Sequence, residues 1–282
     1  MEILSTAITL ENSRSIAIGG FDGMHIGHQA LFNELDANGV IVVIETGYAN
    51  LTPQKYREHY NDHKIEYLKL EDIRHLDGEG FIKLLQEKFP KLQKIVVGYD
   101  FHFGKDRKYS FNDLKKLFDG EVVVVDEVKH NNDSVHSHKI RAKLQIGDIK
   151  GANEFLGHNY SIIGERIEGQ GIGSRELVAT INLKVEDFLL PKEGVYATLT
   201  RIDDEEHFHP SVSFIGHRVS TDGSFAVESH ILDGAVVCEK KAEISFVNFI
   251  RNNEKFDSIE KLKEAIKKDI AQANKVLHRL AL

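Results

Sequence analysis

The 282-residue sequence contains one cysteine, Cys238, no tryptophan and only four prolines. A single cysteine excludes an intrachain disulfide and is typical of proteins in a reducing compartment, so we expect a cytoplasmic protein. No hydrophobic run approaches the roughly 18 residues that a membrane-spanning helix needs. The first residues lack the basic start and long apolar core of a secretory signal peptide, so we expect no membrane partner.

An excess of basic residues is also absent. The chain has 36 lysines and arginines against 44 aspartates and glutamates, which gives a net charge of −8. The excess of acidic residues is shared equally by the two parts of the chain. Residues 1–157 contain 20 basic and 24 acidic residues, and residues 158–282 contain 16 and 20. Neither part has the basic surface on which nucleic-acid-binding proteins depend. We therefore expect small-molecule substrates and no nucleic-acid partner; a homo-oligomer stays open.

Residues 1–157 alternate between strand-like and helix-like segments. Strands are predicted where short apolar runs occur, at Ser15–Ile18, Val40–Glu45, Lys94–Gly98 and Glu121–Asp126. Helices are predicted at Glu79–Phe89, Asn112–Phe118 and Ser137–Ile146. Alternation of this kind is typical of α/β domains with a parallel sheet, in which ligands bind beyond the carboxyl ends of the strands.

A glycine-rich turn follows the first strand and leads into a helix that is predicted to end at Asn38-Gly39. The turn reads Gly19-Gly20-Phe21-Asp22-Gly23-Met24-His25-Ile26-Gly27-His28. Such a turn presents backbone N–H groups to an anion, and two histidines three residues apart share one helix face. We therefore predict attack on the α-phosphate of a nucleoside triphosphate beside His25 and His28. The predicted nucleotide contacts in the turn are Gly19, Phe21, Asp22, Gly23 and Gly27.

The pattern changes after Gly157, so we predict two domains, residues 1–157 and 158–282. Six short strands separated by turns predict an all-β barrel: Ser161–Gly164, Ile181–Val185, Tyr196–Arg201, Ser211–Gly216, Phe225–Leu232 and Ala242–Asn248. A final helix is predicted from Ser258 to Leu280, because an apolar stripe recurs there at helical spacing with lysines opposite.

Further motifs accompany the glycine-rich turn in both domains. The first domain contains Gly19–His28, Val97–Gly104 and Ile140-Arg141 followed by Gly147-Asp148. The second contains Thr180-x-Asn182, Leu190–Ala197, Glu228–Leu232 and Ile250–Phe256. In their order and spacing, which are more specific than any one motif, they resemble the motifs of bacterial bifunctional riboflavin kinase/FAD synthetases over almost the whole chain.

The resemblance implies an α/β nucleotidyltransferase-like parallel-sheet domain followed by a six-stranded β-barrel riboflavin kinase domain with a C-terminal helix. It also implies two reactions. The barrel would phosphorylate riboflavin to FMN with ATP, and the α/β domain would transfer AMP from ATP to FMN, which gives FAD and pyrophosphate. Both reactions would need Mg²⁺.

The resemblance assigns roles to single residues. In the α/β domain, His25, His28 and Arg141 would stabilise charge on the phosphates, because fixed donors are what adenylyl transfer needs. The flavin contacts would be Asp100, Phe101 and Phe103, although both phenylalanines read as core residues without the resemblance.

In the barrel, Glu228 matches the catalytic glutamate, which would accept the proton of the ribityl hydroxyl. Thr180 and Asn182 would face the metal, since neutral oxygens suit Mg²⁺ bound to ATP. Gly171 and Gly173 could cradle phosphate.

Some positions depart from the family pattern. Leu177-Val178-Ala179 stands where the family has Gly-Phe-Pro before Thr180. An alternative is therefore a degenerate barrel that binds flavin or assists assembly without catalysis. His130, His136 and His138 form a small group in the sequence, for which phosphate contact or plain surface is favoured over zinc.

A second alternative is a class I aminoacyl-tRNA synthetase, because His25-Ile26-Gly27-His28 spells that family's signature. The short chain, its acidic balance and the lack of a Lys-Met-Ser-Lys-Ser-like loop argue against it.

Overall fold

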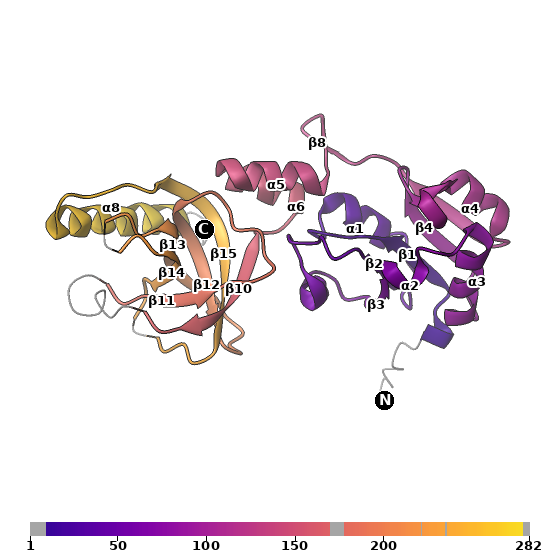
Figure 1. Ribbon diagram of the computed structural model, residues 1–282, viewed down its shortest axis with the longest axis horizontal. Helices are drawn as coiled ribbons and strands as arrows, with labels where there is room; N and C mark the ends of the chain where they lie inside the picture. Colours follow the sequence, from indigo (N-terminus) through magenta and orange to yellow (C-terminus); the bar gives the residue numbers. More distant parts are fainter. Residues whose placement is uncertain (1–9, 170–177, 221, 235, 279–282) are drawn as a thin grey trace. The chain divides into compact units, whose positions relative to one another are not determined.

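A computed structural model of the protein describes residues 10–169, 178–220, 222–234 and 236–278. The chain divides between Ser137 and His138 into two compact units (Figure 1). The first is built on a parallel sheet and the second on a closed barrel. Both fold classes that the sequence predicts are confirmed.

The first unit contains a five-stranded parallel sheet with the order β3-β2-β1-β4-β7. The strands are β1 (Ser15–Gly19), β2 (Val40–Glu45), β3 (Lys64–Lys69), β4 (Lys94–Gly98) and β7 (Glu121–Val125). The chain adds strands first on one side of β1 and then on the other, so the strand order reverses between β1 and β4. Ligands of open α/β sheets bind at such a reversal, beyond the carboxyl ends of the strands.

Helices and short turns complete this unit. The α-helices are α1 (Ile26–Phe32), α2 (Leu70–Ile73), α3 (Gly78–Lys88) and α4 (Phe111–Leu117). The 3-10 turns are η1 (Leu10–Asn12), η2 (Gln54–Tyr60) and η3 (Lys105–Arg107). Two small hairpins pair β5 (His102–Phe103) with β6 (Tyr109–Ser110), and β8 (Lys129–His130) with β9 (Asp133–Ser134).

Successive side chains of a strand point to opposite faces of the sheet, so β1 contributes to two cores. Ile16 and Ile18 pack with the cluster that includes Phe81 of α3. Ala17 packs with the opposite cluster, which includes Phe32 of α1. The central strand is therefore buried on both faces, and helices cover the sheet on two sides.

Two expectations for this unit need correction. The helix after the glycine turn ends at Phe32 rather than at Asn38-Gly39, since the chain leaves the helix in a series of turns, one of which bonds the Gly39 N–H to the Asp36 carbonyl. Strand β3 was not predicted. Its sequence, Lys-Ile-Glu-Tyr-Leu-Lys, carries three charges because it lies at the edge of the sheet.

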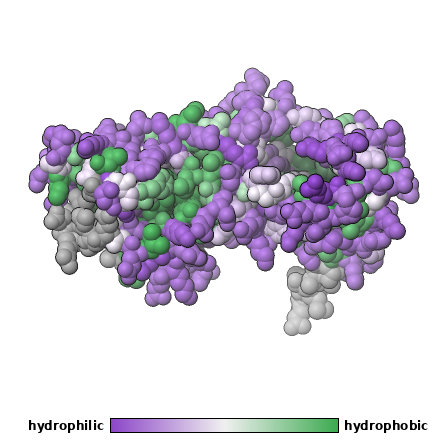
Figure 2. Space-filling view, in the orientation of Figure 1, coloured by the Kyte–Doolittle hydropathy of each residue, from purple (hydrophilic) through white to green (hydrophobic). Residues whose placement is uncertain are grey.

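The second unit is a closed barrel with the strand order β10-β11-β14-β13-β12-β15. Its elements are α5 (Ser137–Ile146), α6 (Ile149–Leu156), β10 (Ser161–Ile167), β11 (Ile181–Lys184), β12 (Gly194–Ile202), β13 (His209–His217), β14 (Phe225–Ile231), β15 (Lys241–Asn252) and α8 (Ile259–Leu277). All six predicted strands and the final helix are present. On the face shown in Figure 2, hydrophobic side chains gather over the barrel strands.

The barrel separates polar from apolar side chains by alternation. Thr198 and Thr200 of β12 are fully buried and bond to Ser211 at 2.7 and 2.8 Å. Ala197 and Leu199, which alternate with them, pack with residues of α8. The buried hydroxyls satisfy one another, so burial does not leave them without partners.

Helix α6 belongs with the barrel in the structure. The Asn153 side chain donates to the Phe246 carbonyl at 2.9 Å and accepts the Tyr160 N–H at 2.8 Å. The compact unit therefore begins before the expected domain boundary at Gly157. That boundary, which divides residues 1–157 from residues 158–282, stays a prediction about the part that folds independently.

We predict that a fragment of residues 158–282 folds alone and that a fragment of residues 138–282 is more stable. The longer fragment keeps the buried apolar face of α6, which comprises Ile149, Ala152, Phe155 and Leu156. Thermal unfolding followed by circular dichroism measures both. Equal melting temperatures would show that α6 adds nothing, and failure of the shorter fragment alone would move the boundary to Ser137.

Candidate functional site

The glycine-rich turn lies at the carboxyl end of β1, the central strand of the sheet. It passes through backbone angles that residues with a side chain seldom adopt, with φ of 48° at Phe21 and 44° at Met24. Gly23, at φ 91°, adopts such an angle without strain. Phe21 and Met24 are held by burial in the core that contains Phe32 of α1. The core thus fixes a backbone loop at the ligand-binding edge.

Two buried charged side chains brace this loop. The Asp22 carboxylate accepts the N–H groups of Leu51 and Thr52 at 2.9 and 3.0 Å. The Arg57 guanidinium, which is 1% exposed, donates to the Gly20 carbonyl at 3.3 Å. These bonds tie residues 51–57 to the turn. The structure therefore gives Asp22 a bracing role, while its contact with nucleotide stays a prediction.

His25 and His28 stack ring on ring at the end of the turn. Their centroids are 3.4 Å apart and their planes differ by 19°. His25 Nδ1 also accepts the backbone N–H of His28 at 3.3 Å, which caps α1. Gly27 leaves room for this arrangement, because a Cβ there would lie 3.1 Å from the His25 ring. The structure brings the predicted pair together.

Electrostatics keep His28 neutral. Burial lowers the pKa of His28 well below 6.5, and the nearby His25, Arg57 and His136 act in the same direction. The ring therefore carries a single N–H near pH 7. Its Nδ1 is buried and has no hydrogen-bond partner in the described part of the chain. Because Nδ1 is enclosed by protein, a ligand oxygen can reach this ring only at Nε2.

The second predicted motif follows β4, the neighbour of β1. Asp100 is exposed there, at the same edge of the sheet. Phe101 and Phe103 instead lie in the core, where their rings stack with centroids 5.6 Å apart and Phe103 contacts Phe81. Their burial supports core packing, and their contact with flavin stays a prediction.

Arg141 lies on α5, which the structure groups with the second unit. Its predicted place beside the phosphates of the first unit's nucleotide stays a prediction.

The predicted kinase residues meet on two neighbouring strands of the barrel. Asn182 of β11 stands directly opposite Glu228 of β14 in the antiparallel register. The Asn182 side chain reaches Thr180 Oγ1 at 3.4 Å. His230, two residues after Glu228, bonds the carbonyl of Ala179 at 2.8 Å. The segment before Thr180 is thus held against β14, although it lacks the family's glycine and proline.

Arg218, just beyond β13, joins these residues. Its Nε donates to Glu228 Oε1 at 2.9 Å, and its Nη2 donates to Asn182 Oδ1 at 2.7 Å. The same arginine reaches Ser224 Oγ at 2.9 Å through Nη1. One guanidinium therefore holds both the predicted proton acceptor and a predicted metal ligand.

Three sequence expectations fall outside the described residues. They are Gly171 and Gly173, the predicted phosphate-binding glycines, and Leu177.

Comparison with known proteins matches both parts of the chain. A riboflavin kinase family model matches residues 156–277, and an FAD synthetase family model matches residues 49–139. A bifunctional riboflavin kinase/FMN adenylyltransferase of Buchnera aphidicola subsp. Acyrthosiphon pisum is 30% identical, over 92% of each chain. The chain belongs to this family.

Other similar proteins also match this chain over most of its length. The bifunctional riboflavin kinase/FMN adenylyltransferase of Listeria monocytogenes is 29% identical over 91% of this chain and 90% of its own. A crystal structure described as a macrolide-efflux protein from Streptococcus pneumoniae matches with a TM-score of 0.78 and 25% identity, covering 92% of this chain and 93% of its own. Among the described helices, none is both long and apolar enough to cross a membrane.

Family membership decides between the sequence-based alternatives. Both domains match flavin-cofactor enzymes, which supports the bifunctional prediction over a degenerate barrel and over an aminoacyl-tRNA synthetase.

Sequence reasoning missed two arginines. Arg57 stands in a polar segment with no hydrophobic pattern, and its burial depends on a loop that returns to the turn. Arg218 follows strand β13, and its bonds to Glu228 and Asn182 form only when the barrel closes.

We predict that His28→Ala lowers the rate of FAD formation from FMN by about 10²–10³-fold, the usual cost of removing one fixed donor. FMN formation from riboflavin should stay unchanged, because the kinase residues lie in the other unit. Product chromatography after incubation with MgATP measures both rates. His75→Ala, an exposed histidine of the same unit, is the control. Equal loss of both activities in a folded variant would contradict separate sites.

Proposed function

We propose that this chain carries out two successive steps of flavin cofactor synthesis. The second unit phosphorylates riboflavin to FMN, and the first transfers AMP from ATP to FMN with release of pyrophosphate. The observation that best supports the pair of activities is that each unit brings together two of the residues that are predicted to react. His25 stacks on His28 in one unit, and Asn182 faces Glu228 in the other.

Adenylyl transfer needs charge stabilisation more than proton transfer. An oxygen of the FMN phosphate is already anionic, so it attacks the α-phosphate of ATP without a general base. The bond that breaks joins the α- and β-phosphates, and negative charge grows on the pyrophosphate. His28 donates its N–H to a phosphate oxygen, and His25 fixes the position of that ring by stacking. Arg141 is proposed to bind the phosphates, since a guanidinium matches their geometry.

Phosphorylation of riboflavin differs because an alcohol is a poor nucleophile. Glu228 accepts the proton of the terminal ribityl hydroxyl as its oxygen attacks the γ-phosphate of ATP. The phosphoryl group moves to that oxygen and ADP leaves. Burial on one side of β14 and the bond from Arg218 keep the carboxylate at one place.

The residues fit a magnesium ion. Thr180 and Asn182 offer neutral oxygens from positions two residues apart, and Mg²⁺ prefers oxygen ligands while taking most of its charge balance from phosphates. Thr180 Oγ1 and Asn182 Oδ1 would hold it. When bound, the ion would shield the negative charge of the ATP phosphates.

Arg218 links metal binding to the position of Glu228. Its bond to Asn182 Oδ1 uses the atom that would hold the metal. Asn182 would hold the ion with the oxygen that accepts from Arg218 in the structure, whereas the bond from Arg218 to Glu228 does not use that oxygen. This makes Arg218 a positioning residue for the kinase reaction.

The single cysteine supports a reducing compartment, and we place the protein in the cytoplasm on that ground. Its partners are the small molecules riboflavin, FMN and ATP.

The direct test follows labelled ATP. With riboflavin and Mg²⁺, label from the γ-phosphate should appear in FMN, and label from the α-phosphate should appear only in FAD. Transfer of AMP to an amino acid would support a synthetase instead. Riboflavin bound without any labelled FMN would support a degenerate barrel.

We predict that Glu228→Gln lowers FMN formation by about 10²–10⁴-fold with little change in the KM for MgATP, because the amide cannot accept the proton. Asn182→Ala should instead raise the KM for MgATP. Steady-state rates measure both, with Glu264→Gln on α8 as an exposed control. A wild-type rate no higher than that of Glu228→Gln would show that the kinase site is inactive.

We predict that Arg218→Ala lowers kcat for FMN formation by about tenfold to a hundredfold, the scale expected when a reacting group is misplaced. The KM for MgATP should not rise, because the substitution removes a competitor for Asn182. Arg201→Ala, which breaks the pair with Glu243 elsewhere in the barrel, is the matched control. A higher KM with an unchanged kcat would make Arg218 an ATP-binding residue.

A further inference from the structure

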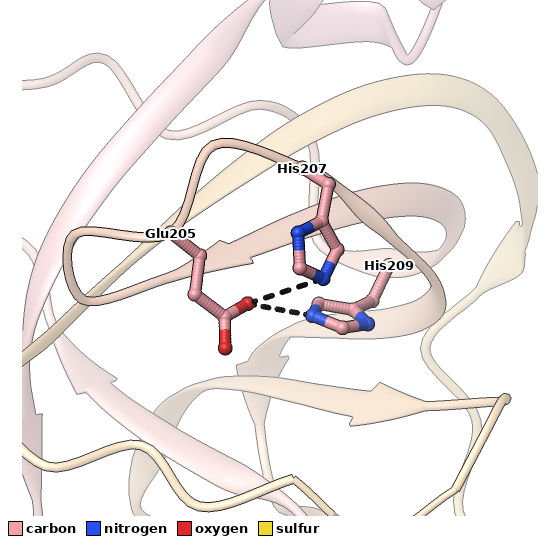
Figure 3. A group of neighbouring side chains, drawn as sticks. All are labelled: Glu205, His207 and His209. Atoms are coloured by element: carbon pink, nitrogen blue, oxygen red, sulfur yellow. Dashed lines mark hydrogen bonds and ion pairs between the residues drawn. The ribbon is translucent and has the colours of Figure 1, made fainter.

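A cluster of metal-binding side chains lies on the connection between β12 and β13, which neither proposed reaction uses. It consists of Glu205, His207 and His209 (Figure 3). Glu205 and His207 come from the loop, and His209 is the first residue of β13. Among the described residues, this is the group of three that lies close enough to share one ion. The histidines that the sequence singled out, His130, His136 and His138, do not form it.

The Glu205 carboxylate faces both imidazoles, whose ring centroids are 4.6 Å apart. Its Oε2 is 2.7 Å from Nε2 of His209 and 3.8 Å from Nε2 of His207. One ligand atom of each residue lies within 4.8 Å of the other two. Figure 3 shows both rings directed at the same carboxylate oxygen. Three potential ligands from different positions therefore converge on one small volume.

The ligand types select the class of ion. Two imidazoles and a carboxylate suit Zn²⁺ and neighbouring first-row metals, whereas Mg²⁺ prefers oxygen alone. Zinc bonds of about 2.0–2.2 Å in a tetrahedron place the ligand atoms roughly 3.3 Å apart. The His209–Glu205 separation is already shorter than this. Only His207 must approach, and its side chain is 70% exposed and can change rotamer at low cost.

The backbone around the cluster is anchored on both sides. Asp203 accepts the N–H groups of Glu239, Lys240 and Lys241 at 2.9, 2.8 and 3.0 Å, which ties the start of the loop to the segment before β15. His209 pairs with Thr200 in the β12–β13 ladder. The loop therefore presents its ligands from fixed ends, which reduces the ordering that metal binding would require.

The cluster is separate from the proposed magnesium residues. His209 begins β13, while Arg218 of the kinase site follows the end of that strand. The eight steps from His209 to His217 span roughly 26 Å at about 3.3 Å per residue. An ion on the loop would not touch the groups that hold MgATP.

We propose that Glu205, His207 and His209 bind one divalent ion of the zinc class through Oε2 and the two Nε2 atoms. Three protein ligands leave the fourth position to water or to an outside ligand. The ion replaces the proton shared by His209 and Glu205 and crosslinks the loop to β13. The proposal does not rest on either flavin reaction.

The test uses the untagged full-length protein at about pH 7.5, where an ordinary imidazole is neutral. Titration with Co²⁺ should give visible d–d absorption bands, and added Zn²⁺ should remove them. Isothermal titration should give one zinc per chain, unaffected by excess Mg²⁺. Zinc should also raise the melting temperature, because it binds only the folded loop.

Substitutions distinguish zinc binding at this cluster from zinc binding by other histidines of the chain. His207→Ala and His209→Ala should each weaken zinc binding at least about tenfold, since even loss of an outer-shell partner costs 10–100-fold in known sites. Glu206→Gln, the exposed neighbouring acid, should bind as the wild type does. FMN and FAD formation should be unchanged in all three. Absence of cobalt bands, or zinc binding that both histidine variants retain, would overturn the proposal.

Discussion

The register between neighbouring strands determines where the residues of both proposed sites lie. In the barrel, the antiparallel pairing of β11 with β14 sets Asn182 opposite Glu228, and the pairing of β13 with β14 brings the chain to Arg218. A slip of one residue would turn Glu228 to the other face, where Val227 and Ser229 are buried. In the parallel sheet, β1 pairs with β2 and β4, so the glycine turn opens where the strand order reverses.

Hydrophobic periodicity made most of this architecture predictable. Short apolar runs predicted four of the five strands of the parallel sheet, and short runs separated by turns predicted all six barrel strands. The edge strand β3 was not predicted, because the exposed Lys64 and Lys69 and the half-buried Glu66 interrupt its apolar residues. Helix α6 was not predicted either, because its eight residues lie in the short stretch between the predicted helix Ser137–Ile146 and the predicted strand Ser161–Gly164.

The candidate sites were predictable only in part. Residues close in sequence, such as His25 and His28, could be grouped from helical spacing. Residues joined by folding could not, because Arg57 reaches the turn from 37 positions away and Arg218 reaches Asn182 from 36. For Phe101 and Phe103 the structure confirms the core packing that their apolar side chains indicate, and the flavin contact that the family motif implies stays a prediction.

The two proposed reactions use two sets of residues, and with the exception of Arg141 these sets lie in different units. The most direct measurement mixes equal amounts of the His28→Ala and Glu228→Gln proteins with riboflavin and MgATP. If each site works alone and releases FMN to solution, the mixture forms FAD although neither protein does so by itself. If the mixture accumulates FMN without FAD, or forms neither, the assignment of one reaction to each unit is wrong.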